Sequence, residues 1–173
     1  LPNSFVFEVN VAFFQNGNSN IFYEVEGGGT PVLLLAPGGM RSANAFWENM
    51  SWNPRESLLE EFELIGMDQR NAGKSEAPIS PTDGWSQYTL DQLALLDHLG
   101  VKECHLVGMC IGGPFIAGLL KAAPHRFLSA VMHHPRFQRG DLSTNFIAVE
   151  FGERFVPGET EHKDVDLIVA VTG

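Results

Sequence analysis

The stretch "VGMCIGG", residues 107–113, decides the fold expected for this chain. It ends a short apolar run and leads into "PFIAGLLKAA", which has the composition of a helix. Glycines lie two residues before and two residues after Cys110, so the backbone is free to turn sharply at the cysteine. A strand, a G-x-C-x-G turn and a helix in this order form a nucleophile elbow. The alternative is a small buried thiol in a tight packing site, because free cysteine is often buried.

An elbow would hold the cysteine at an accessible turn and favour its thiolate form. Gly108 and Gly112 lack the side chains that would otherwise collide across the turn. The helix that begins directly after Cys110 favours a thiolate there, because its first amides and its dipole stabilise negative charge. We therefore expect the backbone N–H of Ile111 to be one donor of an oxyanion hole.

A second oxyanion donor is expected from the segment "PVLLLAPGGMRS", residues 31–42. It reads as a buried strand followed by a glycine-rich loop. Gly38 and Gly39 let the backbone approach a bound acyl oxygen closely, so the N–H of Gly39 or Met40 can point toward it. The two segments occur in the order and spacing that acyl-transfer chemistry needs.

The remaining apolar pattern predicts an α/β fold. Short, continuously apolar runs are typical of parallel strands buried on both faces, and they occupy residues 31–36, 62–68, 104–109 and 127–133. Helical segments separate them, at residues 86–100 and 111–123. Two β-rich runs joined by "QNGNSN" predict an antiparallel hairpin at a sheet edge. We expect a mostly parallel sheet with helices on both faces and an antiparallel N-terminal hairpin.

Within the first helix, leucines at helical spacing predict the apolar face, and Gly100 is expected to end the helix. These leucines are Leu90, Leu93, Leu96 and Leu99. Asp91 and Asp97 are expected to be solvated or capping residues. In the loop "MDQRNAGKS", Asp68 and Arg70 are expected to brace the loop by hydrogen bonds rather than to react.

Composition narrows the class of protein. The formal net charge is −10, from 21 acidic and 11 basic residues, which argues against nucleic-acid binding and against a polybasic membrane anchor. The chain contains no run near the roughly 20 apolar residues of a membrane span and no visible signal peptide. Its two cysteines form no disulfide framework, and Cys104 is expected in the core. A reducing, cytoplasmic setting is expected.

Over residues 5–135 the sequence resembles the α/β-hydrolase superfamily. The resemblance depends on "LLLAPGGMRS", on the segment from "YTLDQLALLDHLG" through the elbow, and on "GMDQRNAGKSEAP", which is similar to the D-x-R-G-x-G-x-S loop of many members. Cysteine in place of serine, with a second glycine after the elbow, resembles the dienelactone-hydrolase elbow. The resemblance implies a hydrolase that attacks small-molecule esters or related acyl bonds with Cys110 and needs no cofactor or metal.

The family's catalytic acid and histidine lie late in the chain, after further strands. We expect a core at residues 1–135 and a diverged or truncated C-terminal segment at 136–173, with one more strand at 165–171. His133 and His134, at the end of the strand after the elbow, are the candidate bases, and the alternative is that the pair only caps the strand. The alternative to an enzyme is a catalytically impaired or incomplete hydrolase-fold protein that acts as a binding or interaction module. An uncovered sheet edge in such a protein would favour a homodimer.

Overall fold

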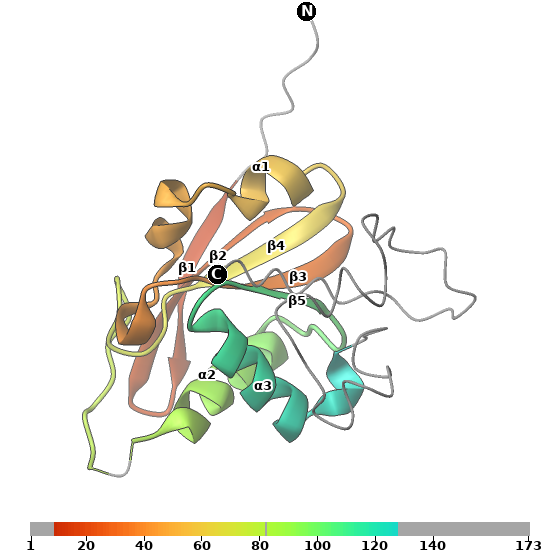
Figure 1. Ribbon diagram of the computed structural model, residues 1–173. Coiled ribbons are helices and arrows are strands. Elements are labelled where there is room, and N and C mark those ends of the chain that lie inside the picture. The colour runs from red at the N-terminus through yellow and green to blue at the C-terminus, as the bar shows by residue number, and fades with distance from the viewer. Residues whose placement is uncertain (1–8, 82, 128–173) are drawn as a thin grey trace, which may run out of the picture.

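The computed structural model describes residues 9–81 and 83–127. They form a sheet with the strand order β1-β2-β4-β3-β5 (Figure 1). The strands are β1 (Asn10–Asn16), β2 (Ser19–Gly27), β3 (Thr30–Leu35), β4 (Phe62–Met67) and β5 (His105–Gly108). The α-helices are α1 (Pro54–Leu58), α2 (Trp85–His98) and α3 (Gly112–Ala122). Short 3₁₀ helices are η1 (Gly39–Arg41), η2 (Asn44–Asn49) and η3 (Pro124–Arg126).

The direction of the strands agrees with the α/β prediction. β4, β3 and β5 are parallel, whereas β2 pairs with β4 in the antiparallel sense. β1 and β2 form the predicted hairpin, in which Asn16 pairs with Ser19 across a two-residue loop. Gly17 begins that loop with φ at 59°, a backbone conformation that glycine adopts easily. The hairpin therefore forms one edge of the sheet, as expected.

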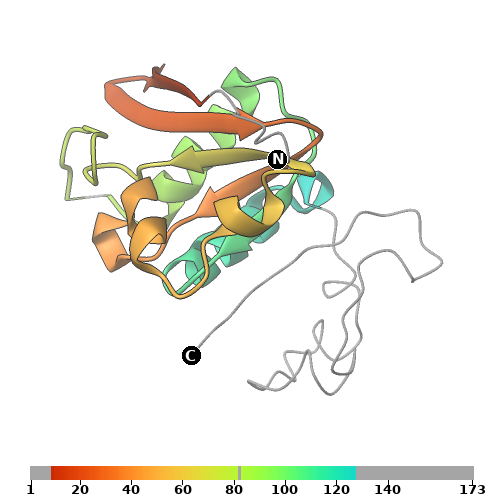
Figure 2. The same cartoon turned by 90° about the horizontal axis from the view of Figure 1, so that it is seen from above.

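Both faces of the sheet are covered, because neighbouring residues of β3 point into different cores. Leu33 and Leu35 belong to a cluster that includes residues of α2 and α3. Val32 and Leu34 belong to a second cluster that contains Trp47 of η2. Figure 1 shows α1 on one side of the sheet and α2 and α3 on the other, and the same layers can be followed in Figure 2. The prediction of helices on both faces is confirmed.

Helix α2 exists, and its predicted apolar face is correct except at Leu90. Leu96 is fully buried, and Leu93 and Leu99 are partly buried against the same core, whereas Leu90 is 54% exposed. Asp91 is also fully buried, so the expectation that it would be solvated is wrong. Its burial is possible because it forms an ion pair, and a leucine-spacing pattern contains no information about such a partner. The helix ends as predicted, since Gly100 has φ at 71° directly after its last residues.

The predicted core position of Cys104 is confirmed. Cys104 is 5% exposed and forms an isolated parallel bridge with Phe127. Burial raises the pKa of its thiol to about 12, against a smaller opposing effect of Arg126. The rest of the predicted strand at 127–133 and the segment at 136–173 lie outside the described residues. Among the described helices, none has both the length and the hydropathy that crossing a bilayer requires.

Candidate active site

Cys110 occupies a strained, exposed position between β5 and α3. Its φ is 57°, and Asn71 is the only other non-glycine residue with positive φ among the described residues. This region of backbone space is unfavourable for residues with a Cβ, and such strain persists only where the surrounding structure enforces it. The Cys110 residue is exposed, in contrast to the buried Cys104. The sharp turn is therefore present, and the thiol is not part of the core.

The glycines around Cys110 have the predicted steric role. A Cβ on Gly108 would lie 2.9 Å from the carbonyl carbon of Gly112. A Cβ on Gly112 would lie 2.5 Å from the carbonyl oxygen of Leu35 on β3. The N–H of Met109 also donates a hydrogen bond of 3.3 Å to that oxygen. The elbow is therefore packed directly against the end of β3.

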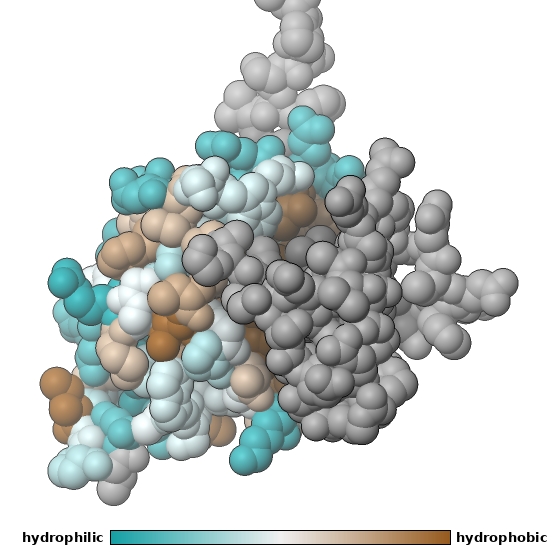
Figure 3. All heavy atoms as spheres, viewed as in Figure 1, coloured by the Kyte–Doolittle hydropathy of each residue, from teal (hydrophilic) through white to brown (hydrophobic). Residues whose placement is uncertain are grey.

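The first turn of α3 leaves backbone amides beside the cysteine. The N–H of Gly112 donates to the oxygen of Met109 at 2.9 Å, and the N–H of Gly113 donates to the oxygen of Cys110 at 3.1 Å. Ile111 is the N-cap residue of the helix. The Ile111 N–H precedes these two donors and has no acceptor within the turn, which makes it a suitable oxyanion donor. Hydrophobic residues are visible in the middle of the face where β5 leads into α3 (Figure 3).

The loop after β3 provides the second set of amides. Gly38 and Gly39 have φ at 119° and 61°, and a Cβ on Gly38 would lie 3.0 Å from the ring of Phe46. In the η1 turn, the N–H groups of Arg41 and Ser42 donate to the oxygens of Gly38 and Gly39, each at 3.2 Å. The N–H groups that precede these donors, on Gly39 and Met40, have no acceptor within the turn.

Strand pairing brings the two loops to the same edge of the sheet. Leu35 pairs with Gly108 in the parallel β3–β5 ladder, so both strands end together. The glycine loop leaves this edge after β3, and the elbow leaves it after β5. Open α/β sheets bind ligands at the carboxyl ends of their strands. The described residues thus place Gly39, Met40, Cys110 and Ile111 at one edge.

Asp68 braces the loop that follows β4, as predicted, and also binds the backbone of η2. Its carboxylate accepts hydrogen bonds from the N–H groups of Asn44 and Lys74, each at 2.8 Å. A Cβ on Gly73 would lie 2.1 Å from one of its oxygens. Asp68 is 4% exposed and is fully engaged in holding η2 to the loop that follows β4.

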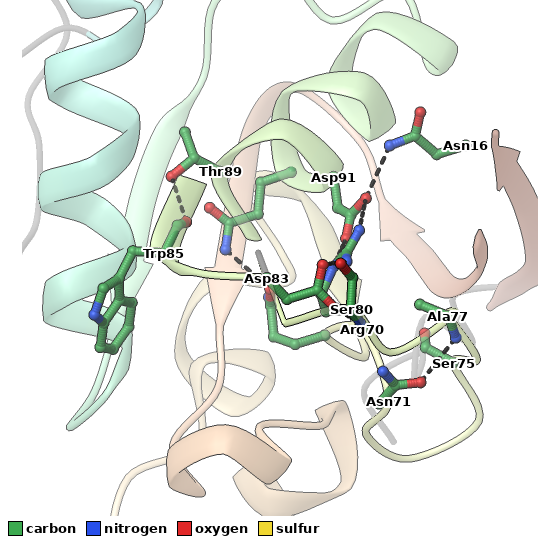
Figure 4. Close-up of polar contacts among 12 residues, drawn as sticks. Asn16, Arg70, Asn71, Ser75, Ala77, Ser80, Asp83, Trp85, Thr89 and Asp91 are labelled. Atoms are coloured by element: carbon green, nitrogen blue, oxygen red, sulfur yellow. Dashed lines mark hydrogen bonds and ion pairs between the residues drawn. The ribbon is translucent and has the colours of Figure 1, made fainter. Parts of the chain in front are cut away.

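Arg70 also has a structural role, and its main partner is the buried Asp91. Arg70 Nε and Nη2 donate to the Asp91 carboxylate at 2.7 and 3.2 Å. Asn16 donates to the same carboxylate at 2.8 Å, and Asp83 lies 3.5 Å from Arg70 (Figure 4). The hydrogen bond to Asp91 raises the pKa of Arg70 despite the opposing effect of burial. This charged cluster ties the loop after β4 to α2 and to the hairpin.

The candidate bases, His133 and His134, lie outside the described residues. His98 stacks on Phe14 with ring centroids 5.0 Å apart, which gives it a structural role. The buried His105 packs edge-to-face against Phe62 and has a structural role as well. No group of three or more metal-binding side chains occurs in the part of the chain that the structure describes.

Comparison with known proteins identifies a family and several relatives of this chain. A family model described as the alpha/beta hydrolase fold matches residues 31–168. RutD of Azorhizobium caulinodans, named as a carbamate hydrolase, is 32% identical over 117 residues, which are 68% of this chain and 42% of that protein. Carboxylesterase YbfK of Bacillus subtilis is 27% identical over 105 residues, which are 61% of this chain and 34% of that protein.

Solved structures show the same fold. The 2-hydroxy-6-oxo-6-phenylhexa-2,4-dienoate hydrolase of Rhodococcus matches 72% of this chain and 45% of its own, with 26% identity and a TM-score of 0.59. An epoxide hydrolase variant of Vigna radiata matches 70% of this chain and 37% of its own, with 22% identity and a TM-score of 0.58. The chain thus spans less than half the length of these relatives. Because the family model covers most of the chain, and the described strands follow the same architecture, the chain belongs to the alpha/beta hydrolase fold family.

Proposed function

We propose that this protein is a hydrolase of small-molecule esters or related acyl compounds that uses Cys110 as its nucleophile. The observation that supports this most strongly is the geometry of Cys110, which is exposed and has φ at 57° between β5 and α3. Such an elbow presents a nucleophile at the carboxyl edge of the sheet. The alternative of a buried packing thiol does not agree with an exposed cysteine.

The proposed reaction begins when the Cys110 thiolate attacks the carbonyl carbon of the substrate. The carbonyl oxygen becomes an oxyanion, which accepts hydrogen bonds from the N–H of Ile111 and from the N–H of Gly39 or Met40. The carbon–oxygen bond to the alcohol then breaks, and the alcohol takes up a proton. Water hydrolyses the resulting thioester, which releases the acid and regenerates the thiol.

A base is needed to take the thiol proton and later to activate water, and a histidine suits both steps. His133 and His134 are proposed for this role on sequence grounds alone. The proposed chemistry needs no cofactor. The names of RutD and YbfK, a carbamate hydrolase and a carboxylesterase, support a carbonyl substrate with an oxygen or nitrogen leaving group. We also propose a cytoplasmic location, since free cysteines such as Cys104 and Cys110 are typical of a reducing compartment.

Thiol alkylation tests whether Cys110 is the reactive cysteine. With one equivalent of iodoacetamide at pH 8, Cys110 is expected to be labelled at least about tenfold faster than Cys104, as followed by peptide mass spectrometry. Cys104 is buried and has a pKa of about 12, so about one thiol in ten thousand is ionised at that pH. Equal rates for the two cysteines would contradict an accessible nucleophile at the elbow.

Turnover tests the proposed reaction. Hydrolysis of 4-nitrophenyl acetate is expected to fall at least about a hundredfold in Cys110→Ala, because the covalent step is lost. Cys104→Ala is the matched control and should keep its activity once corrected for the folded fraction. Release of nitrophenolate that is the same in the original chain and in Cys110→Ala would reject the enzyme proposal. That result would favour the alternative of a binding or interaction module.

A further inference from the structure

Arg41 differs from the other arginines in the described part of the chain. Arg55 pairs with Glu24 and Glu26, and Arg126 pairs with Asp97. Arg70 pairs with Asp91, as described above. Arg41 is exposed and has no carboxylate within ion-pair distance among the described residues. In a chain with 21 acidic residues, an arginine without such a partner has its guanidinium available for a ligand.

The backbone holds Arg41 next to the proposed oxyanion donors. Arg41 is the last residue of η1 and directly follows Met40. The next residue, Ser42, is fully buried, and its hydroxyl donates a hydrogen bond of 2.6 Å to the oxygen of Ala36. The oxygen of Ser42 accepts a bond of 3.0 Å from the N–H of Gln69. These bonds fix the backbone from which the Arg41 side chain extends.

The two segments that carry the proposed oxyanion donors contain no acidic residue. Residues 36–47, which follow β3, include neither Asp nor Glu, and the same is true of residues 105–120, which contain the elbow. Asp68 lies on the neighbouring loop, but it is buried and accepts two backbone hydrogen bonds. Arg41 is the only Asp, Glu, Lys or Arg residue of these two segments, so no carboxylate within them competes for its guanidinium. A guanidinium without such a competitor can attract an anionic ligand.

We propose that Arg41 is a specificity-determining residue that binds a carboxylate of the substrate, so that the site takes acyl substrates with a negative charge. This inference rests on the proposed function, because it concerns the same edge and the same nucleophile. A guanidinium suits the role, since its planar set of N–H donors matches the two oxygens of a carboxylate.

Paired alkylating reagents test Arg41 without requiring turnover. Iodoacetate is an anion and iodoacetamide is neutral, but both alkylate the thiolate sulfur through their CH2 carbon and release iodide. The rate of labelling of Cys110 by iodoacetate, divided by its rate of labelling by iodoacetamide, is expected to fall about threefold in Arg41→Gln. A change of this size is what the loss of an exposed ion pair gives. Taking the ratio cancels any change in the ionisation of the thiol. Lys121→Gln, which removes a charge from the last turn of α3, is the matched control and should change the ratio by less than about 1.5-fold.

The outcomes separate this inference from the proposed function. If Arg41→Gln and Lys121→Gln change the ratio equally, Arg41 has only a general electrostatic effect and the inference is wrong. If Arg41→Gln alone lowers the ratio while no ester is hydrolysed, the anion site stands and the hydrolase proposal fails. Retention of the original ratio in Arg41→Lys would show that charge alone is sufficient and that the planar group is not needed.

Discussion

Replacing Asp91 with alanine is expected to lower the free energy of unfolding by about 3–5 kcal/mol, which is the usual cost of removing one member of a buried ion pair. The Asp91 side chain is 1% exposed and that of Arg70 is 9% exposed. Without the carboxylate, the Arg70 guanidinium stays buried with only the more distant Asp83 to compensate it. The amide of Asn16 loses its acceptor as well. Urea denaturation followed by circular dichroism measures the change.

Asp97→Ala is the matched control for Asp91→Ala. Asp97 lies on the same helix and also pairs with an arginine, Arg126, at 2.7 Å, but its side chain is 69% exposed. Exposed ion pairs contribute at most about 1 kcal/mol, so this variant should stay close to the original stability. If the two variants are equally stable, Asp91 is not a buried anchor of α2.

Gly112→Ala is expected to destabilise the protein by about 2–3 kcal/mol, in the upper part of the range for overpacking a core. The added Cβ would lie 2.5 Å from the carbonyl oxygen of Leu35, and a backbone oxygen at the end of a paired strand, already bonded to the N–H of Met109, cannot move aside cheaply. Relief of the collision requires α3 and the elbow to move away from β3. We therefore expect slower labelling of Cys110 by iodoacetamide together with the loss of stability, which urea denaturation measures.

The next residue provides the control for that change. A Cβ on Gly113 meets no atom within 4 Å, and Gly113 lies in the first turn of the same helix. Gly113→Ala should raise the stability by up to about 1 kcal/mol, because alanine loses less conformational freedom in a helix than glycine does. Equal stability of the two variants would show that the elbow is not held tightly against β3.

The features that the sequence predicted correctly depend on local patterns. Strands at 31–36, 62–68 and 104–109 are continuous apolar runs, which only a sheet covered on both faces can bury. The elbow was recognisable because a turn with two close backbone approaches needs glycine at Gly108 and Gly112. The bracing role of Asp68 and Arg70 also followed from their place in the loop after a strand.

The features that were missed depend on contacts between distant segments. The leucine spacing of α2 placed Leu90 inside and Asp91 outside, whereas the structure has the reverse. Asp91 is buried because Arg70 reaches it from another loop, and nothing near Asp91 in the sequence indicates that partner. The 3₁₀ helices and α1 were also missed. They are too short to show a hydrophobic period, and they are ordered by packing, as the fully buried Trp47 in η2 shows.

The pairing of Leu35 with Gly108 also has a consequence for how the protein folds. These residues are distant in the sequence, and closing such a long segment is slow compared with forming a helix or a hairpin. During synthesis on the ribosome, β3 emerges long before β5, its partner in this pairing. The bend at Cys110 lacks its contacts with β3 until the two strands meet, so we expect the cysteine to acquire its final conformation late in folding.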